Sequence, residues 1–223
     1  MNISIFPLEK HSFTFPNPLY ANDEGLIAYG GDLNPNRIMV AYTNGIFPWY
    51  NEDDPILWWC PNPRYVLKPD EFKVSKSLRK TINSNKFEIK FDTSFVQVMV
   101  ECRKIRKNKE GTWIHKEIID AYSKIFEMGF AHSFEAYLDG ELVGGGYGIS
   151  IGDIFCGESM FTKESDASKV ALYHLVQRLK DKGYRYIDCQ VPSEHLKSLG
   201  AKPMPREEFL QDVKSSLENL RGF

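Results

Sequence analysis

The sequence predicts an α+β fold, with a small irregular N-terminal domain (residues 1–64) followed by a larger α/β domain (65–223). Proline and glycine interrupt the first part of the chain repeatedly, and both residues break helices and strands. From residue 74 onward the hydrophobic pattern becomes regular and alternates between helical and strand periods. A chain of 223 residues is long enough for one large domain with a small one attached.

In the N-terminal part, Gly30-Gly31 predicts a turn. Asn34 and Pro35 then predict a helix start, because Asn caps helix N-termini and Pro is tolerated at the first helical position. Gly45 predicts the end of that helix. The segments 47–50 and 54–64 are bounded by prolines, and we expect a loop and a strand there.

The larger domain begins with helices and continues with strands. An aspartate-glycine pair, Asp139-Gly140, indicates a β-hairpin. We expect helices at 74–83, 93–107, 115–128, 167–182, 193–199 and 205–220, and strands at 132–138, 141–149, 154–161 and 184–190.

The composition is that of an ordinary globular protein, with 42% hydrophobic and 26% charged residues. No apolar run approaches the ~18 residues of a membrane span, and the N-terminus lacks the pattern of a secretory signal. The four cysteines form no CxxC or CxxH pair, so we expect neither a metal site nor a disulfide framework. These features favour a cytoplasmic protein with reduced thiols and no membrane contact, and a monomer is the default expectation.

Positive charge is concentrated in one stretch of a chain whose net charge is −2. Residues 68–109 contain twelve Lys or Arg against five Asp or Glu. Such a stretch indicates an anionic partner, although a solvated helix face is the commoner origin of lysine-rich segments. The candidates for contacts with a phosphate backbone are Lys76, Arg79, Lys80, Arg103, Lys104, Arg106 and Lys107.

The order of helices and strands in the larger domain resembles the N-acetyltransferase (GNAT) fold. In that fold the strands that match 154–161 and 184–190 run side by side and then splay apart around the substrate carbonyl. A more specific resemblance comes from five segments that stand in one order: GLIAYGGDL (25–33), GIFPWY (45–50), EGTWI (110–114), GESMF with ASK (157–161 and 167–169) and IDCQ (187–190). Together they resemble the leucyl/phenylalanyl-tRNA–protein transferases.

That resemblance implies transfer of Leu or Phe, and less well Met, from aminoacyl-tRNA to proteins that begin with Arg or Lys, which marks them for N-end rule degradation. The reaction is aminolysis of an ester and needs no cofactor. An α-amine has a pKa of roughly 8, so about a tenth is neutral at pH 7. Positioning, a proton acceptor and stabilisation of the oxyanion therefore suffice.

The resemblance assigns catalysis to Asp188, Gln190 and Glu158. Asp188 and Gln190 are two apart on an expected strand, so a buried carboxylate there can polarise the Gln190 amide. Two alternatives remain: proton transfer through a tRNA 2′-hydroxyl, and an Asp188 that only bonds local backbone. Glu158, expected on one face with Met160, needs a cation, either from a substrate or from the protein's own Lys169.

The resemblance places Trp49 and Trp113 around the 3′ adenosine of the tRNA, where flat aromatic surfaces can stack on the base. Packing within the protein is the commoner role of a loop tryptophan. The candidates for the amino-acid pocket are Gly146, Met160, Leu172, Leu175, Leu179 and Ile187. Gly146, Leu175 and Leu179 stand where the family has bulkier residues, which predicts a roomier pocket that favours Phe over Leu.

Three other functions compete with this one. A Cys189 nucleophile with His195 as base is disfavoured, because alternation points Cys189 away from Asp188 and Gln190. A coenzyme A-dependent N-acetyltransferase is the second alternative. Its glycine-rich pyrophosphate loop is missing from FTKESDASK (161–169). A non-catalytic RNA- or peptide-binding module is the third.

Overall fold

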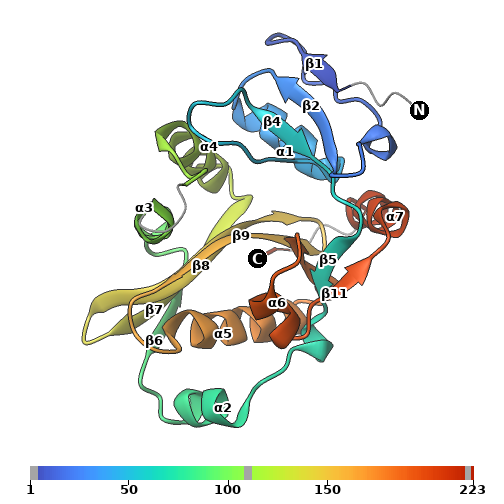
Figure 1. Cartoon of the computed structure of the whole chain (residues 1–223). Helices are drawn as coiled ribbons and strands as arrows, with labels where there is room; N and C mark the ends of the chain where they lie inside the picture. Colours follow the sequence, from blue (N-terminus) through green and yellow to red (C-terminus); the bar gives the residue numbers. More distant parts are fainter. Residues whose placement is uncertain (1–4, 108–111, 219–221) are drawn as a thin grey trace.

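The structure is a computed structural model that describes residues 5–107, 112–218 and 222–223. Its N-terminal part is a four-stranded sheet with strand order β1-β2-β4-β3, packed on helix α1 (Figure 1). The strands are short, as the prolines and glycines of this region predict. They are β1 (Phe6–Leu8), β2 (Leu26–Gly30), β3 (Phe47–Pro48) and β4 (Leu57–Trp59).

Helix α1 (Pro35–Thr43) begins and ends where the sequence predicts. The Asn34 side chain accepts a hydrogen bond from the Asn36 backbone N–H and so caps the first turn. After the helix, Gly45 has a φ of +71°, a left-handed conformation that favours glycine.

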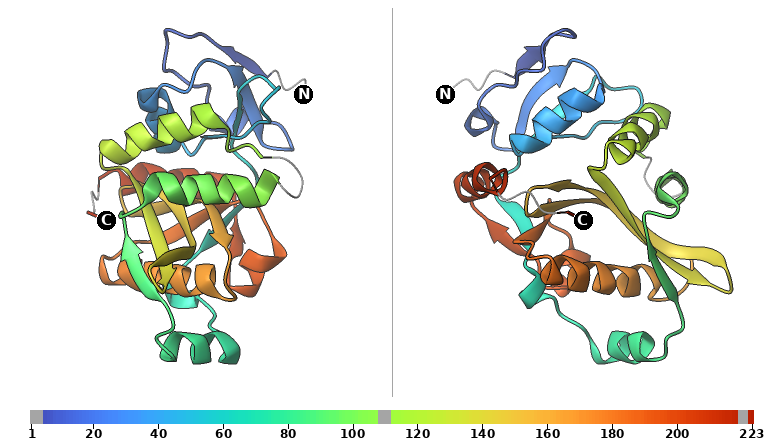
Figure 2. Two further views of the ribbon diagram at one scale, coloured as in Figure 1. Left: turned by 90° about the vertical axis from the view of Figure 1, so that its left-hand side faces the viewer. Right: turned by 180° about the vertical axis from the view of Figure 1, so that it is seen from behind.

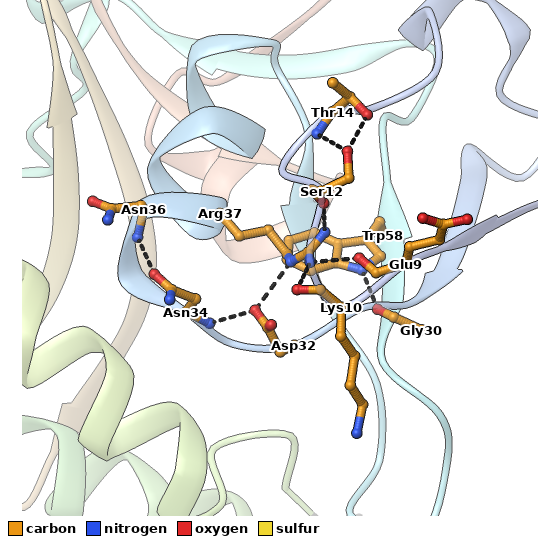
Figure 3. Close-up of polar contacts among 10 residues, drawn as sticks. All are labelled: Glu9, Lys10, Ser12, Thr14, Gly30, Asp32, Asn34, Asn36, Arg37 and Trp58. Carbon is orange, nitrogen blue, oxygen red and sulfur yellow. Dashed lines mark hydrogen bonds and ion pairs between the residues drawn. The ribbon is translucent and has the colours of Figure 1, made fainter.

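A fully buried arginine of α1 holds the start of the chain in place (Figure 3). The Arg37 guanidinium donates to the backbone oxygens of Glu9, Lys10 and Ser12 at 2.7–3.0 Å and pairs with Asp32 at 3.0 Å. Asp32 of the GGD segment therefore has a structural role in this ion pair. It follows that this part of the family resemblance reflects folding.

The larger part of the chain is built on a seven-stranded sheet with strand order β11-β5-β10-β9-β8-β7-β6. Its central strands are the predicted ones, and the Asp139-Gly140 turn joins β7 to β8 with both residues at positive φ. The pattern-based prediction does not include β5, β6 and β11, since strands of only three or four residues carry little periodic signal. The strands are β5 (Arg64–Leu67), β6 (Glu88–Phe91), β7 (Ala131–Leu138), β8 (Glu141–Ile151), β9 (Ile154–Thr162), β10 (Tyr186–Gln190) and β11 (Lys202–Met204).

Helices cover both faces of this sheet (Figures 1 and 2). Helix α5 (Ala167–Asp181) packs on one face, with α2 (Lys76–Asn83) beyond it. Helices α3 (Phe95–Lys107) and α4 (Lys116–Glu127) lie on the other face, between the sheet and the N-terminal part. The short α6 (Glu194–Ser198) and α7 (Arg206–Ser216) flank the strands β10 and β11. Two 3₁₀ turns, Pro18–Tyr20 and Pro69–Glu71, complete the described elements.

The predicted α+β, GNAT-like fold is confirmed. Strands β7, β8 and β9 are antiparallel, and β10 then lies parallel to β9 after the crossover helix α5. One apolar core runs from the N-terminal sheet to the α4 side of the large sheet, and a second lies under α5. We keep the division into 1–64 and 65–223 as a proposal. In the part of the chain that the structure describes, no helix has the length and apolarity that crossing a bilayer requires.

Candidate active site

A cavity of about 420 Å³ opens where β9 and β10 separate. The two strands pair in parallel only over residues 154–156 and 186–188, after which β9 pairs only with β8 and β10 only with β5. The walls come from these strands, from α5 and α6, and from residues 47–49 of the N-terminal part. The expected splay therefore exists, and the N-terminal part closes one side of it.

Two β-bulges shape the splay. The pairing of β9 with β8 skips Glu158, and the pairing of β10 with β5 skips Cys189. A bulge breaks strict alternation and re-aims the neighbouring side chains. Met160 therefore packs against the core under α5, whereas Glu158 bonds Tyr42 of the opposite core. The expectation that Glu158 and Met160 share one face is wrong for this reason.

The Glu158 carboxylate faces the cavity and is otherwise surrounded by protein. Its Oε1 accepts hydrogen bonds from the Tyr42 hydroxyl at 2.6 Å and from Gln190 Nε2 at 3.0 Å. Burial raises the pKa of Glu158 to about 7, and these hydrogen bonds limit the rise. Lys169, the alternative partner within the protein, pairs instead with Asp166 at 3.3 Å. Among the described residues, no basic side chain forms an ion pair with Glu158.

A chain of buried hydroxyls stands behind Glu158. The Tyr42 hydroxyl lies 2.8 Å from that of Tyr122, and both side chains are buried. Burial, reinforced by the charge of Glu158, raises the pKa of both phenols well above the usual value. Both tyrosines therefore stay protonated, so Tyr42 is a lasting donor to the carboxylate.

Asp188 forms a buried ion pair with an arginine that the sequence analysis did not single out. Arg64 Nε lies 2.7 Å from Asp188 Oδ1 and Arg64 Nη2 lies 2.6 Å from Oδ2, and both side chains are at most 1% exposed. The Arg64 guanidinium also donates to the Gly45 carbonyl and is packed between the rings of Phe47 and Phe209. The pair thus ties β5 and β10 to the N-terminal part.

Asp188 is not in contact with the cavity. Its Oδ1 accepts the backbone N–H of Gln190 at 2.9 Å, and Gln190 adopts a left-handed φ of +58°. The carboxylate beside the Gln190 amide is therefore Glu158, and not Asp188 as expected. Asp188 positions Gln190 through the backbone, which is the local bonding that we weighed as its alternative role.

Both predicted tryptophans line the cavity. The Trp49 side chain, at the rim, is 45% exposed, and its backbone oxygen accepts from Trp59 Nε1 at 2.6 Å. Trp113 packs against the core on its other side. Trp58, on β4, is fully buried. Two aromatic faces therefore stand at the cavity, in line with the stacking role that the resemblance implies.

Four of the six residues predicted for the amino-acid pocket line the cavity, namely Met160, Leu172, Leu175 and Ile187. Leu179 does not, because it is fully buried in the core under α5.

Gly146 does not line the cavity either, and it leaves no empty space. A Cβ atom at residue 146 would lie 2.5 Å from Phe134 Cζ and 2.7 Å from Met160 Cγ. Both of these neighbours line the cavity. Gly146 therefore adds no open space of its own, and its effect on the pocket stays a prediction: a larger residue there would have to displace these two lining side chains.

The basic stretch is divided between two sides of the domain. Lys76, Arg79 and Lys80 are exposed on α2, beyond α5. Arg103 and Lys104 lie on α3, on the opposite face of the sheet (Figure 2). They do not form one continuous patch, which a charge count along the chain cannot reveal.

Residues of α3 differ in their contacts. Lys104 pairs with Glu101 at 2.9 Å, whereas Arg106 lines the cavity and donates from Nε to Ser159 Oγ at 3.0 Å. The Lys107 side chain and residues 108–111, which include the start of EGTWI, lie outside the described part of the chain.

The thiol alternative finds no support in the geometry. Cys189 lines the cavity, but its Sγ contacts the Ile187 carbonyl at 3.7 Å, and burial raises the pKa of its thiol. Burial lowers the pKa of His195. A thiolate is therefore not favoured.

The coenzyme A alternative is also disfavoured. In GNAT enzymes the N-terminus of the helix that follows the fourth strand binds pyrophosphate. Here Asp166 stands at that position of α5 and contacts Thr81 and Lys169. A carboxylate at this helix end repels a pyrophosphate.

Sequence reasoning missed Arg64 and Tyr42. Neither lies in a local motif that suggests its partner, since 124 residues separate Arg64 from Asp188 and 116 separate Tyr42 from Glu158. Only an unsatisfied buried acid could have indicated that such partners exist.

Comparisons with known proteins agree with the geometry. Residues 66–214 match the family model described as leucyl/phenylalanyl-tRNA protein transferase, and residues 31–62 match the N-terminal domain of that family. The leucyl/phenylalanyl-tRNA–protein transferase of Sulfurimonas denitrificans is 57% identical, over 96% of this chain and 93% of its own. That of Nitrosospira multiformis is 51% identical, over 95% and 88%.

Among solved structures, an aminoglycoside acetyltransferase from a soil metagenomic sample aligns with a TM-score of 0.40 and 14% identity, over 60% of this chain and 89% of that one. The family resemblance of the motifs is confirmed by the sequence relatives and both family models. The chain belongs to the leucyl/phenylalanyl-tRNA–protein transferase family, whose members are aminoacyltransferases.

Proposed function

We propose that this protein transfers Leu or Phe, and less well Met, from aminoacyl-tRNA to the N-terminal Arg or Lys of acceptor proteins. The product is a peptide bond, and the modified proteins are marked for N-end rule degradation in the cytoplasm. The enzyme acts as a monomer and without a cofactor. The observation that carries this proposal is one cavity that combines two tryptophans, an apolar wall and the Glu158–Gln190 pair.

The donor end of the tRNA fits the apolar and aromatic parts of the cavity. The terminal adenine stacks on Trp49 and Trp113, and the Leu or Phe side chain lies against Met160, Leu172 and Leu175. A volume of about 420 Å³ lies within the range of small-molecule sites. The basic residues of α2 and α3 bind backbone phosphates of the tRNA.

The chemical step joins the acceptor nitrogen to the ester carbonyl carbon and breaks the bond from that carbon to the ribose oxygen. Gln190 Nε2 is bonded to Glu158, which leaves Gln190 Oε1 to accept a hydrogen bond from the attacking amine. The proton lost by nitrogen passes to the ribose oxygen that leaves, directly or through the neighbouring 2′-hydroxyl. Asp188 holds the Gln190 backbone throughout.

Acceptor selection falls to Glu158. It is the one acid among the described residues that line the cavity, and the described part of the chain supplies it with hydrogen bonds but with no cation. Asp188, the other candidate, is already neutralised by Arg64. The side chain of an N-terminal Arg or Lys is therefore the cation that Glu158 binds.

The test is transfer of radiolabelled Phe from charged tRNA to a peptide that begins with Arg. We expect transfer to this peptide and to its Lys counterpart, and none to an N-acetylated form. Equal transfer to peptides that begin with Ala or Ser would contradict the proposal. Acetyl-coenzyme A serves as the control donor, and acetylation of the peptide from it would support the N-acetyltransferase alternative instead.

A further inference from the structure

Arg106 differs from every other basic residue of the cationic stretch that the structure describes. It is exposed, yet it lines the cavity, and its Nε donates to the buried Ser159 hydroxyl at 3.0 Å. His195, the other basic side chain described at the cavity, has its pKa lowered by burial and by Lys169 and is therefore largely neutral. Arg106 thus supplies the one permanent positive charge among the described lining residues.

The contacts of Arg106 leave its charge and most of its donors available. On the same helix, Lys104 is paired with Glu101, which also pairs with Lys163 at 3.1 Å. No carboxylate in the described ranges contacts Arg106, and Ser159 engages only Nε. A guanidinium has five N–H donors, and those on the two terminal nitrogens match a phosphate bidentately.

We infer that Arg106 binds the phosphodiester that joins the terminal adenosine of the aminoacyl-tRNA to the nucleotide before it. This rests on the proposed function. A cavity of about 420 Å³ accommodates one aminoacyl nucleoside and not a chain of nucleotides. The nucleotide chain must therefore leave through the rim, and its first charged group is the phosphate on the 5′ side of the adenosine. Arg106 is the rim residue of opposite charge, and Ser159 orients it.

The test measures binding of two uncleavable donors: a cytidylyl-adenosine dinucleotide with Phe joined by an amide, and the same compound with an uncharged methylphosphonate linkage. Wild type should bind the phosphodiester about tenfold more tightly, the effect of one charge-assisted contact. Arg106→Gln should abolish that difference and leave binding of the methylphosphonate unchanged. Lys104→Gln, the matched control, should keep the difference. For the phosphodiester, the slope of log affinity against log salt should fall by about 0.7 in Arg106→Gln.

Three results would overturn the inference. Wild type could bind both donors equally, Arg106→Gln could keep the tenfold difference in affinity, or Arg106→Gln could lose affinity for both donors by the same factor. A Ser159→Ala variant, which frees the guanidinium without removing its charge, should show a smaller loss confined to the phosphodiester. If wild type transfers no Phe from charged tRNA, it is the proposed function that fails. The binding comparison reports on Arg106 separately from that outcome.

Discussion

Two acids on neighbouring strands of the splay have opposite surroundings. Asp188 on β10 is inaccessible to solvent, and Arg64 satisfies both of its oxygens. Glu158 on β9 faces the cavity and receives hydrogen bonds from Tyr42 and Gln190, and no basic side chain in the ranges that the structure describes pairs with it. The difference indicates different roles. Asp188, the paired acid, holds the strands together, whereas Glu158, the unpaired acid, is available to bind a positive charge on the substrate.

The largest expected effect, on the free energy of unfolding, comes from breaking the Arg64–Asp188 ion pair. Asp188→Asn leaves the buried Arg64 guanidinium without its counter-charge, and removal of one partner from a buried pair costs about 3–5 kcal/mol. Urea unfolding should show this loss, whereas Arg64→Met combined with Asp188→Leu should recover much of it. A loss below about 1 kcal/mol for Asp188→Asn would mean that the ion pair does not hold this part of the fold.

Gln190 links the two acids, since its backbone bonds Asp188 and its side chain bonds Glu158. Gln190→Ala keeps the backbone bond and removes the amide. We expect kcat to fall about 100-fold, the usual effect of losing one positioned polar group, with donor binding unchanged. Single-turnover kinetics and a donor-binding isotherm measure the two quantities. Normal turnover would assign the amine contact to a tRNA hydroxyl, which a 2′-deoxy donor tests in turn.

The unpaired acid should make stability depend on pH. The raised pKa of Glu158, about 7 against a usual 4.5, means that the folded state keeps a proton that the unfolded state has already lost. The unfolding free energy of wild type, relative to Glu158→Gln, should therefore fall as pH rises from about 4.5 to 7. The slope is at most about 1.4 kcal/mol per pH unit, and less because the side chain is partly exposed. If the unfolding free energies of wild type and Glu158→Gln differed by the same amount at every pH in this window, the raised pKa of Glu158 would be contradicted.

Removal of the Tyr42 hydroxyl should have a smaller effect. Tyr42→Phe deletes one hydrogen bond that favours the charged form of Glu158, so the pKa of Glu158 should rise further. We expect a stability change of about 1 kcal/mol and a shift of the pH profile for acceptor use toward higher pH. The profile of kcat/KM against pH measures the shift. Tyr122→Phe, which does not contact the carboxylate directly, is the control and should shift the profile less.

Sequence patterns predicted the central strands, the helices and the hairpin, because these elements have strong periodicity and turn signals. They did not predict the edge strands β6 and β11, which are short. Glu158, Gln190, Trp49 and Trp113, all taken from the family motifs, line one cavity.

What the sequence could not predict depends on contacts between distant residues. The bulges at Glu158 and Cys189 break the alternation from which side-chain directions were inferred. The Arg64–Asp188 pair joins residues 124 positions apart, and the space beside Gly146 is filled by Phe134 and Met160 from other strands. Each of these facts requires the register between strands, which a single strand does not encode.

The central claim is that Glu158 selects the acceptor through its positive side chain. The direct test compares kcat/KM for peptides that begin with Arg or with citrulline, its neutral isostere, in wild type and Glu158→Gln. A phenyllactyl donor, which lacks the α-ammonium group, is the control for charge on the donor. We predict that wild type prefers Arg by about 10- to 100-fold, as expected for hydrogen bonds to a charged group, and that Glu158→Gln uses both peptides about equally. The claim would be contradicted if Glu158→Gln still preferred the Arg peptide, or if kcat/KM fell by the same factor for both peptides.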